Sequence, residues 1–334
     1  MKHTLLIIIT ALFSLSSQAL LINGAGASFP APIYSKWFLE FQKEQQDVRI
    51  NYQSIGSGAG ITQVVSQTVD FGASDAPMKE EEIKKSAVPI LHIPTVMGAV
   101  TISYNLPDYQ GELKLTPELL TGIFLGQIKT WDDPQLLKLN PNLASVANKY
   151  ILTVQRSDGS GTTSIFTEYL SKVSPEWKTK VGEGKSVSWP TGLGGKGNEG
   201  VSGVIKQNPG AIGYVELTFA LANSLRTAVL KNSAGQFVKA DLATVTAAAA
   251  GVQIQEDLRM SITNSNAKMA YPISAFTYLL VPQQMSKEKG QKILEFLTWA
   301  LSKGQSMTGA MHYAPLPDKV IAKAKLNIQK IQLQ

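Results

Sequence analysis

The stretch ILTVQRSDGSGTTSIFTEYL, residues 151–170, decides the fold class of this chain. Its first four residues are mostly apolar and predict a short buried strand. A loop rich in glycine and serine follows at residues 156–162, and apolar side chains then return at helical spacing. The helical positions expected to face the core are Ile165, Phe166, Tyr169, Leu170 and Val173. A buried strand that leads through a glycine-rich turn into a helix is typical of an α/β domain.

The same alternation of strand and helix patterns extends in both directions from this stretch. The predicted strands are residues 48–52, 89–104 and 271–281, and the predicted helices are residues 60–68, 242–252, 287–301 and 317–328. Another helix is expected to begin at Thr116-Pro117-Glu118, with the Thr as its cap and Gly126 near its end. The glycine-rich residues 189–200 are expected to form a loop. The pattern indicates two α/β lobes with mainly parallel sheets, joined by extended crossing strands.

The N-terminus has the layout of a cleavable secretory signal. Lys2 and His3 precede an apolar run at residues 5–13, and small or polar residues lead to Ala19, after which we expect cleavage. No later stretch approaches the roughly 20 apolar residues that a membrane span needs. We therefore expect a soluble mature protein outside the cytoplasm, of about 315 residues, enough for roughly two domains.

Composition narrows the function classes. The chain has no cysteine, which excludes disulfides, a thiol nucleophile, a lipid-modified N-terminal cysteine and thiolate metal sites. The formal charge is +6, but the basic residues are scattered and no run of five like charges occurs. This mild excess of positive charge either favours encounter with an anion or is ordinary surface charge. It gives nucleic-acid binding little support.

Three glycine-rich turns, residues 24–30, 55–60 and 158–162, place hydroxyl side chains just before a predicted helix. Helix N-termini present unpaired N–H groups and a partial positive charge, so they attract anions. Glycine lets the backbone come close to a ligand, and Ser or Thr adds a hydroxyl donor. Any one of these turns alone would be read as a simple helix cap. Three of them together favour an anion site.

Three charged residues near these turns need an explanation. Arg156 precedes the third turn, and its guanidinium can give an oxyanion two parallel hydrogen bonds. Asp158 either orients Arg156 or caps the helix that follows. Asp75 is compatible with a turn before Pro77, and its residue type alone does not assign it to the site.

Six motifs, in this order along the chain, carry a resemblance to a known family. They are GAGASFPAPIYSKW (24–37), INYQSIGSGAG (50–60), VDFGASDAPM (69–78), TVQRSDGSGTTSIFTEYL (153–170), WPTGLGGKGNEGV (189–201) and PGAIGYVE (209–216). Together they resemble the periplasmic phosphate-binding proteins of high-affinity phosphate ABC transporters, the PstS family. The resemblance extends from Asn23 to about Pro317.

The resemblance implies a class II periplasmic-binding-protein fold, with one dehydrated phosphate between two α/β lobes. The implied phosphate-binding residues are Ser28, Phe29 through its backbone N–H, Ser57, Asp75, Arg156, Asp158, Ser160, Gly161 and Thr162. Asp75 matches the carboxylate that accepts a ligand proton, which would favour phosphate over sulfate. Ser28 departs from a relative that has Thr there, but the hydroxyl is retained.

The resemblance also implies a periplasmic location, a domain arrangement and partners, and it places the loop at residues 189–200 near the surface of the lobes. Lobe I would comprise residues 20–104 and 275–334, and lobe II residues 105–274, with hinge strands near Asn105 and Ile273. The expected partners are inner-membrane permease subunits and their ATPase. We expect a monomer with no cofactor and no metal.

Two alternatives remain from the residues themselves. An exported hydrolase or phosphatase would use Ser160 or Ser57 as nucleophile, which needs a base. After processing only His92 and His312 remain, neither in a motif that suggests such pairing, and His92 reads as a structural histidine, so we predict no enzyme. The second alternative is a protein of the same fold that binds sulfate, molybdate or another oxyanion.

Overall fold

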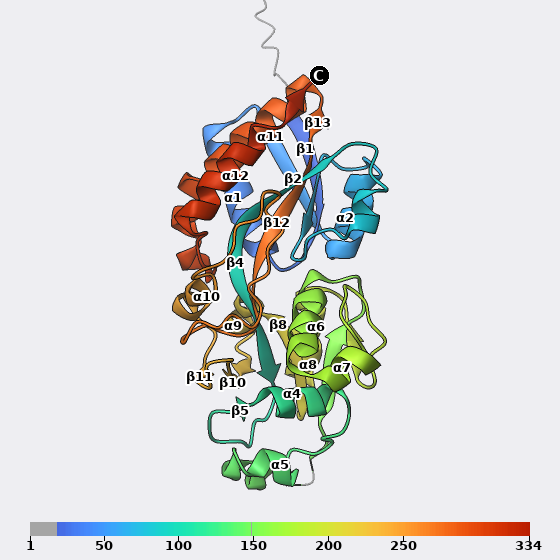
Figure 1. The fold of residues 1–334 in the computed structure, drawn as a ribbon, viewed down its shortest axis with the longest axis vertical. Helices are drawn as coiled ribbons and strands as arrows, with labels where there is room; N and C mark the ends of the chain where they lie inside the picture. The colour runs from blue at the N-terminus through green and yellow to red at the C-terminus, as the bar shows by residue number, and fades with distance from the viewer. Residues whose placement is uncertain (1–18, 148) are drawn as a thin grey trace, which may run out of the picture.

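The protein has the α/β architecture that the sequence predicts (Figure 1), here in a computed structural model that describes residues 19–147 and 149–334. Except for Ala19, the predicted signal peptide lies outside the described residues. The strands are β1 (Leu20–Gly26), β2 (Val48–Ser54), β3 (Phe71–Ser74), β4 (Ile90–Tyr104), β5 (Lys114–Leu115), β6 (Leu152–Arg156), β7 (Leu193–Gly195), β8 (Ala211–Glu216), β9 (Arg226–Thr227), β10 (Val229–Lys231), β11 (Phe237–Val238), β12 (Ser274–Pro282), β13 (Gln284–Met285) and β14 (Gln332–Leu333).

Helices pack around the main sheet. They are α1 (Ala31–Glu44), α2 (Ser57–Val65), α3 (Glu80–Ile83), α4 (Pro117–Phe124), α5 (Pro134–Leu137), α6 (Gly161–Val173), α7 (Pro175–Lys180), α8 (Gly197–Gln207), α9 (Leu217–Ala222), α10 (Leu242–Ala248), α11 (Lys287–Ala300) and α12 (Asp318–Ile328), with 3₁₀ turns at Pro141–Val146, Lys303–Met307 and Gly309–Met311. The predicted cap of α4 is confirmed, because the Thr116 side chain accepts a hydrogen bond from the Leu119 N–H. The Ala-rich helix α10 ends at Ala248, four residues earlier than predicted.

One long sheet connects the whole molecule. Its strand order is β2-β1-β3-β12-β4-β8-β6-β7, with β9 paired to β4. The strands are parallel at both ends, where β1 pairs with β2 and β3, and β6 with β7 and β8. In the middle β12 and β4 are antiparallel to each other and to their outer neighbours. The expectation of mainly parallel strands therefore holds at the two ends but not for the crossing strands.

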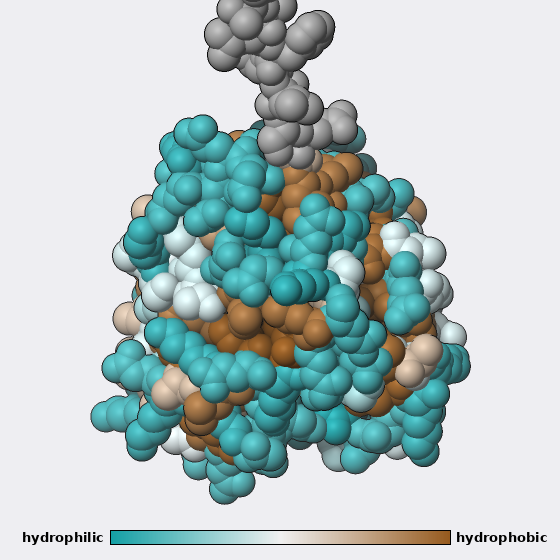
Figure 2. Space-filling view, turned by 90° about the horizontal axis from the view of Figure 1, so that it is seen from above, coloured by the Kyte–Doolittle hydropathy of each residue, from teal (hydrophilic) through white to brown (hydrophobic). Residues whose placement is uncertain are grey.

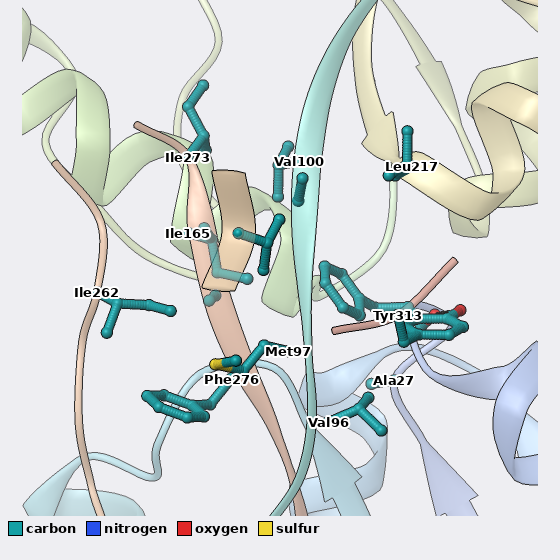
Figure 3. Packing of buried hydrophobic residues seen from close by; sticks show 14 of the residues in the cluster. Ala27, Val96, Met97, Val100, Ile165, Leu217, Ile262, Ile273, Phe276 and Tyr313 are labelled. Carbon is teal, nitrogen blue, oxygen red and sulfur yellow. Dashed lines mark hydrogen bonds between the residues drawn. The ribbon is translucent and has the colours of Figure 1, made fainter. Parts of the chain in front are cut away.

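Strand β4 changes partner part-way along its length. Its residues from Ile90 to Ala99 pair with β12, and those from Val100 to Tyr104 pair with β8. In Figure 1, β4 and β12 run between an upper half, with β1–β3, α1, α2, α11 and α12, and a lower half, with β6–β8, α4 and α6–α8. Figure 3 shows buried side chains on both sides of β4 in this region, with Tyr313 on one side and Phe276 on the other.

The prediction of a loop over residues 189–200 is partly wrong. Leu193–Gly195 forms β7, which pairs with β6, and helix α8 begins at Gly197. Strand pairing uses backbone groups only, so a glycine-rich edge strand carries no apolar alternation that would reveal it. Helix α8 packs Val201 and Ile205 into a small apolar cluster with Val154 of β6 and Ala211 of β8.

The outer surface mixes polar and apolar residues. Seen from the upper end, polar residues cover most of the face, with apolar areas between them (Figure 2). Across residues 19–147 and 149–334, no helix has the length and apolar character needed to cross a membrane.

Candidate anion-binding site

Four helix N-termini meet where the upper and lower halves touch. The upper half contributes the turn at Ser28 before α1 and the start of α2 at Ser57, and the lower half contributes the start of α6 after Ser160. The fourth, the start of α8 at Gly197, was not predicted from the sequence. Helix starts carry unpaired N–H groups and partial positive charge, so this arrangement suits an anion.

Direct backbone contact holds the two halves together at this place. The Gly58 N–H in α2 donates to the Gly159 carbonyl oxygen of the lower half at 2.8 Å. A side chain on Gly161 would overlap Ser57 and Asp75, and one on Gly56, where φ is +90°, would overlap Asp158. Glycine is therefore required on both sides for the halves to approach this closely.

Arg156 lies at the end of β6 and is held by Asp158. Its Nε and Nη2 donate to the two carboxylate oxygens of Asp158 at 2.8 and 2.5 Å, and its side chain is 1% exposed. Burial raises the pKa of Asp158, but the Arg156 guanidinium outweighs it and holds that pKa below its usual value. Nη1 lies 3.4 Å from the Thr162 hydroxyl, so the outer end of the guanidinium remains directed toward the start of α6.

Asp75 follows β3 and is buried, and among the described residues no cation is hydrogen-bonded to its carboxylate. Its Oδ1 accepts from the Thr277 hydroxyl at 2.9 Å, and its Oδ2 lies 3.5 Å from the Ser57 hydroxyl. Burial raises the pKa of Asp75 to about 7, although Thr277, the charge of Arg156 and Ser57 act in the opposite direction. A carboxyl group in this state can exchange a proton near neutral pH.

The remaining predicted residues also lie at this junction. Ser28 and Phe29 are buried between β1 and α1, and the Tyr313 hydroxyl donates to the Phe29 carbonyl oxygen at 2.7 Å. The Ser160 side chain caps α6 by accepting from the Thr163 N–H, and its own N–H donates to the Lys185 carbonyl oxygen. The N–H groups of Gly161 and Thr162, in the first turn of α6, are the helix-end donors here. The structure thus brings all nine predicted residues together.

Asn198 belongs to this cluster, and the sequence analysis missed it. It lies in the first turn of α8 with no exposed surface, and its Nδ2 donates to the hydroxyls of Ser28 and Thr162. The expectation that its segment lies near the surface is therefore wrong at this residue. The available signal was a fourth glycine-rich turn before apolar residues at helical spacing, Val201 and Ile205.

His92, one of the two histidines considered as a catalytic base, has a structural hydrogen bond instead. The His92 Nε2 accepts from the Met78 N–H at 3.0 Å, and burial lowers the pKa of His92 to about 4. The prediction of a structural histidine is confirmed by this bond. In the part of the chain that the structure describes, no group of three His, Cys, Asp or Glu residues could hold a metal ion.

Comparison with known proteins identifies the family of this chain. A family model described as a PBP superfamily domain matches residues 14–303. Phosphate-binding protein PstS of Pasteurella multocida is 45% identical over 337 residues, which cover 100% of this chain and 95% of that protein. The chain belongs to the PstS family. The resemblance inferred from the six motifs is therefore confirmed.

Further PstS-family and structural relatives support the same fold. PstS of Haemophilus influenzae is 46% identical over 313 residues, covering 92% of each chain. The solved structure of the ancestral soluble variant of the human phosphate binding protein superposes with a TM-score of 0.75 at 22% identity, over 91% of this chain and 93% of that one. At this identity the structural match establishes the fold, and the predicted periplasmic-binding-protein fold is confirmed.

Proposed function

We propose that this PstS-family protein is an exported binding protein that captures one inorganic phosphate ion between its two halves and delivers it to an inner-membrane ABC importer. The observation that carries the proposal is the position and burial of Asp75. This buried carboxyl group, with a pKa near neutrality, stands opposite Arg156 and the hydroxyls and helix starts of the lower half.

The physical reason is a shared proton. A carboxylate facing an anion is repulsive unless the ligand brings a proton to the contact, which phosphate does near neutral pH and sulfate does not. A site built around such a hydrogen bond rejects the analogue that lacks it by roughly 10⁴- to 10⁵-fold. The proposed ligands are Ser28, Phe29, Ser57, Asp75, Arg156, Asp158, Ser160, Gly161 and Thr162.

Domain closure is part of the proposal. We retain lobe I as residues 20–104 and 275–334 and lobe II as residues 105–274. The change of partner along β4, between Ala99 and Val100, supports a hinge in the crossing strands. Closure would bring Ser57 and Asp75 against the start of α6, as in the arrangement described above.

The transport context is also proposed. The relatives' names identify binding proteins, which fits the prediction that the chain is not an enzyme. The proposed partners are the permease subunits and ATPase of a phosphate ABC transporter, reached from the periplasm by a monomer after removal of the signal peptide. Neither nucleic acid nor a cofactor is part of the proposed function.

Equilibrium binding of labelled phosphate to the mature, phosphate-stripped protein tests the site. We expect sulfate and molybdate to compete about 10⁴-fold less well than unlabelled phosphate. Asp75→Asn should reduce this preference at least roughly 100-fold, because an amide does not require a proton on the ligand. Asp70→Asn, which removes an acid paired with Lys289 away from the cluster, is the matched control and should leave the preference unchanged.

Other outcomes distinguish the alternatives. Equal competition by sulfate would contradict the phosphate assignment and favour a general oxyanion binder. Steady release of phosphate from phosphoesters that Ser160→Ala abolishes would favour the phosphatase alternative.

A further inference from the structure

Asn198 has its side-chain orientation fixed by its neighbours. Its Oδ1 lies 3.0 Å from the Glu216 backbone N–H, and its Nδ2 lies 2.9 Å from the Ser28 Oγ and 3.3 Å from the Thr162 Oγ1. A backbone N–H can only donate, so the amide oxygen must face Glu216. The amide NH₂ group must then face the two hydroxyls, and it donates to both.

The Ser28 hydroxyl consequently has one direction left for its own proton. Its oxygen accepts from the Asn198 Nδ2 at 2.9 Å and from the Asn198 backbone N–H at 3.2 Å. A hydroxyl has two lone pairs and one O–H donor, and both lone pairs are used here. The O–H must therefore point toward an acceptor other than Asn198.

Both lone pairs of the Thr162 hydroxyl are occupied as well. Its Oγ1 accepts from the Asn198 Nδ2 at 3.3 Å and from the Arg156 Nη1 at 3.4 Å. Ser28 and Thr162 are 1% and 0% exposed, so bulk water does not compete for these contacts. Two buried hydroxyls, one from each half of the molecule, are thus both left as donors.

We propose that Asn198 is a positioning residue that commits the hydroxyls of Ser28 and Thr162 to donate to the bound anion. This inference rests on the proposed function and extends it to a residue outside the predicted ligand set. A free hydroxyl presents either its proton or a lone pair, and a lone pair facing an anion is repulsive. Fixing the Thr162 proton before the anion arrives, and the Ser28 proton as the halves close around it, lowers that ordering cost of binding.

In this arrangement the direction of the Ser28 hydroxyl proton also depends on domain closure. Ser28 belongs to the upper half, whereas Asn198 and Thr162 belong to the lower half. The Thr162 contact with Asn198 lies within the lower half and persists on opening. The Ser28 contacts cross between the halves, so Ser28 becomes an obligate donor only when the halves close.

Phosphate titration calorimetry on the full mature chain tests the role of Asn198. Asn198→Ala should weaken phosphate binding roughly 10- to 100-fold, as expected for hydrogen bonds to a charged group. Asn198→Asp keeps the shape but replaces the donor by an acceptor, so it should weaken binding more than Asn198→Ala. The matched control is Asn208→Ala at the other end of α8, where the Asn208 Nδ2 donates to the Val204 carbonyl oxygen. The Asn208→Ala variant should bind phosphate with the affinity of the wild type.

A multiple-mutant cycle separates positioning from simple structural support. In a Ser28→Ala/Thr162→Val background the hydroxyls are absent, so adding Asn198→Ala should change the affinity less than about threefold. An equal loss in both backgrounds would overturn the inference, and so would wild-type affinity in Asn198→Asp. If the Asn198 variants do not fold, Ser28→Ala and Thr162→Val decide: each should lose roughly tenfold, and unchanged affinity in both would overturn it.

Failure of the proposed function gives a different result. Wild-type protein that does not bind phosphate would contradict the phosphate assignment itself. The same cycle would then be measured with the oxyanion that the wild type does bind, and the coupling between Asn198 and the two hydroxyls would still support or overturn the inference.

Discussion

The proposed anion site has Asp158 on one side and Asp75 on the other, and these two acids behave in opposite ways. Asp158, in the lower half, makes two hydrogen bonds to Arg156, which hold its pKa below the usual value despite partial burial. The carboxylate of Asp75, in the upper half, accepts hydrogen bonds from the Thr277 and Ser57 hydroxyls, and burial raises the pKa of Asp75 to about 7. In the proposed function the lower side therefore attracts the anion, and the upper side discriminates between anions by whether they carry a proton.

The difference arises from local partners rather than residue type. Asp158 is two residues from Arg156, which places carboxylate and guanidinium at the same loop. Asp75 follows β3 in the middle of the sheet, where Thr277 of the neighbouring strand β12 is its hydrogen-bond partner. A carboxylate that lacks a cation in a buried position stays close to protonation.

Removing the charge on the lower side should have the largest effect. Arg156→Ala deletes the cation and leaves Asp158 as an unpaired acid beside the incoming anion. Breaking a buried charge pair costs about 3–5 kcal/mol, so phosphate affinity should fall by hundreds to thousands of times. Isothermal titration calorimetry measures the change.

Two further variants sharpen this result. Adding Asp158→Asn to Arg156→Ala should restore part of the affinity, because the unpaired negative charge is gone. Arg226→Ala is the control, because Arg226 donates hydrogen bonds to the carbonyl oxygens of Tyr109 and Gly111, which do not belong to the proposed site. It should bind phosphate like the wild type, and an affinity loss as large as that of Arg156→Ala would refute the assignment of the lower side.

Sequence analysis predicted β6, the loop at residues 156–162 and α6 better than it predicted the nearby segment that forms β7 and the start of α8. The strand and helix around residues 156–162 carry apolar residues with clear periodicity, and β6 and α6 confirm them. Segment 189–200 has little side-chain pattern, because β7 pairs through its backbone and the first turn of α8 is glycine-rich. Close packing there is what demands glycine: a side chain on Gly195 would overlap Val201 and Gly200.

The tertiary contacts that orient the site residues could not be predicted from the sequence either. The nine site residues were assigned from motif resemblance, but the partners that orient them are distant in the chain. Thr277 is 202 residues from Asp75, and Tyr313 is 284 residues from Phe29. Nothing in the local pattern around either partner indicates such a role, because the sheet order that unites them comes from the whole fold.

The pH dependence of stability should distinguish the two acids. The raised pKa of Asp75, from 3.8 to about 7, means that folding favours its protonated form. Stability from this group is fully present below pH 3.8 and is lost as pH rises through about 7. In the ligand-free protein Asp75→Asn should therefore be more stable than the wild type at pH 8, by on the order of 4 kcal/mol, and equal to it near pH 4.

Urea unfolding across this pH range measures that difference, with Asp158→Asn as the counterpart. Since the pKa of Asp158 is lowered, its stabilising effect is present above its usual value and lost as pH falls. Asp158→Asn should thus destabilise the protein at neutral pH, and the loss should shrink in acid. Parallel pH profiles for Asp75→Asn and the wild type would show that burial does not act on Asp75 in this way.

A smaller effect is expected where the two sides touch. Gly161 begins α6, and the methyl group of Gly161→Ala would overlap Ser57 and Asp75 across the cleft. Overpacking costs about 1–3 kcal/mol, so phosphate affinity should fall roughly 10- to 100-fold by calorimetry. Gly203→Ala in α8 is the control, because nothing lies within 4 Å of its added methyl group. Wild-type affinity in Gly161→Ala would mean that the two sides bind phosphate without coming this close.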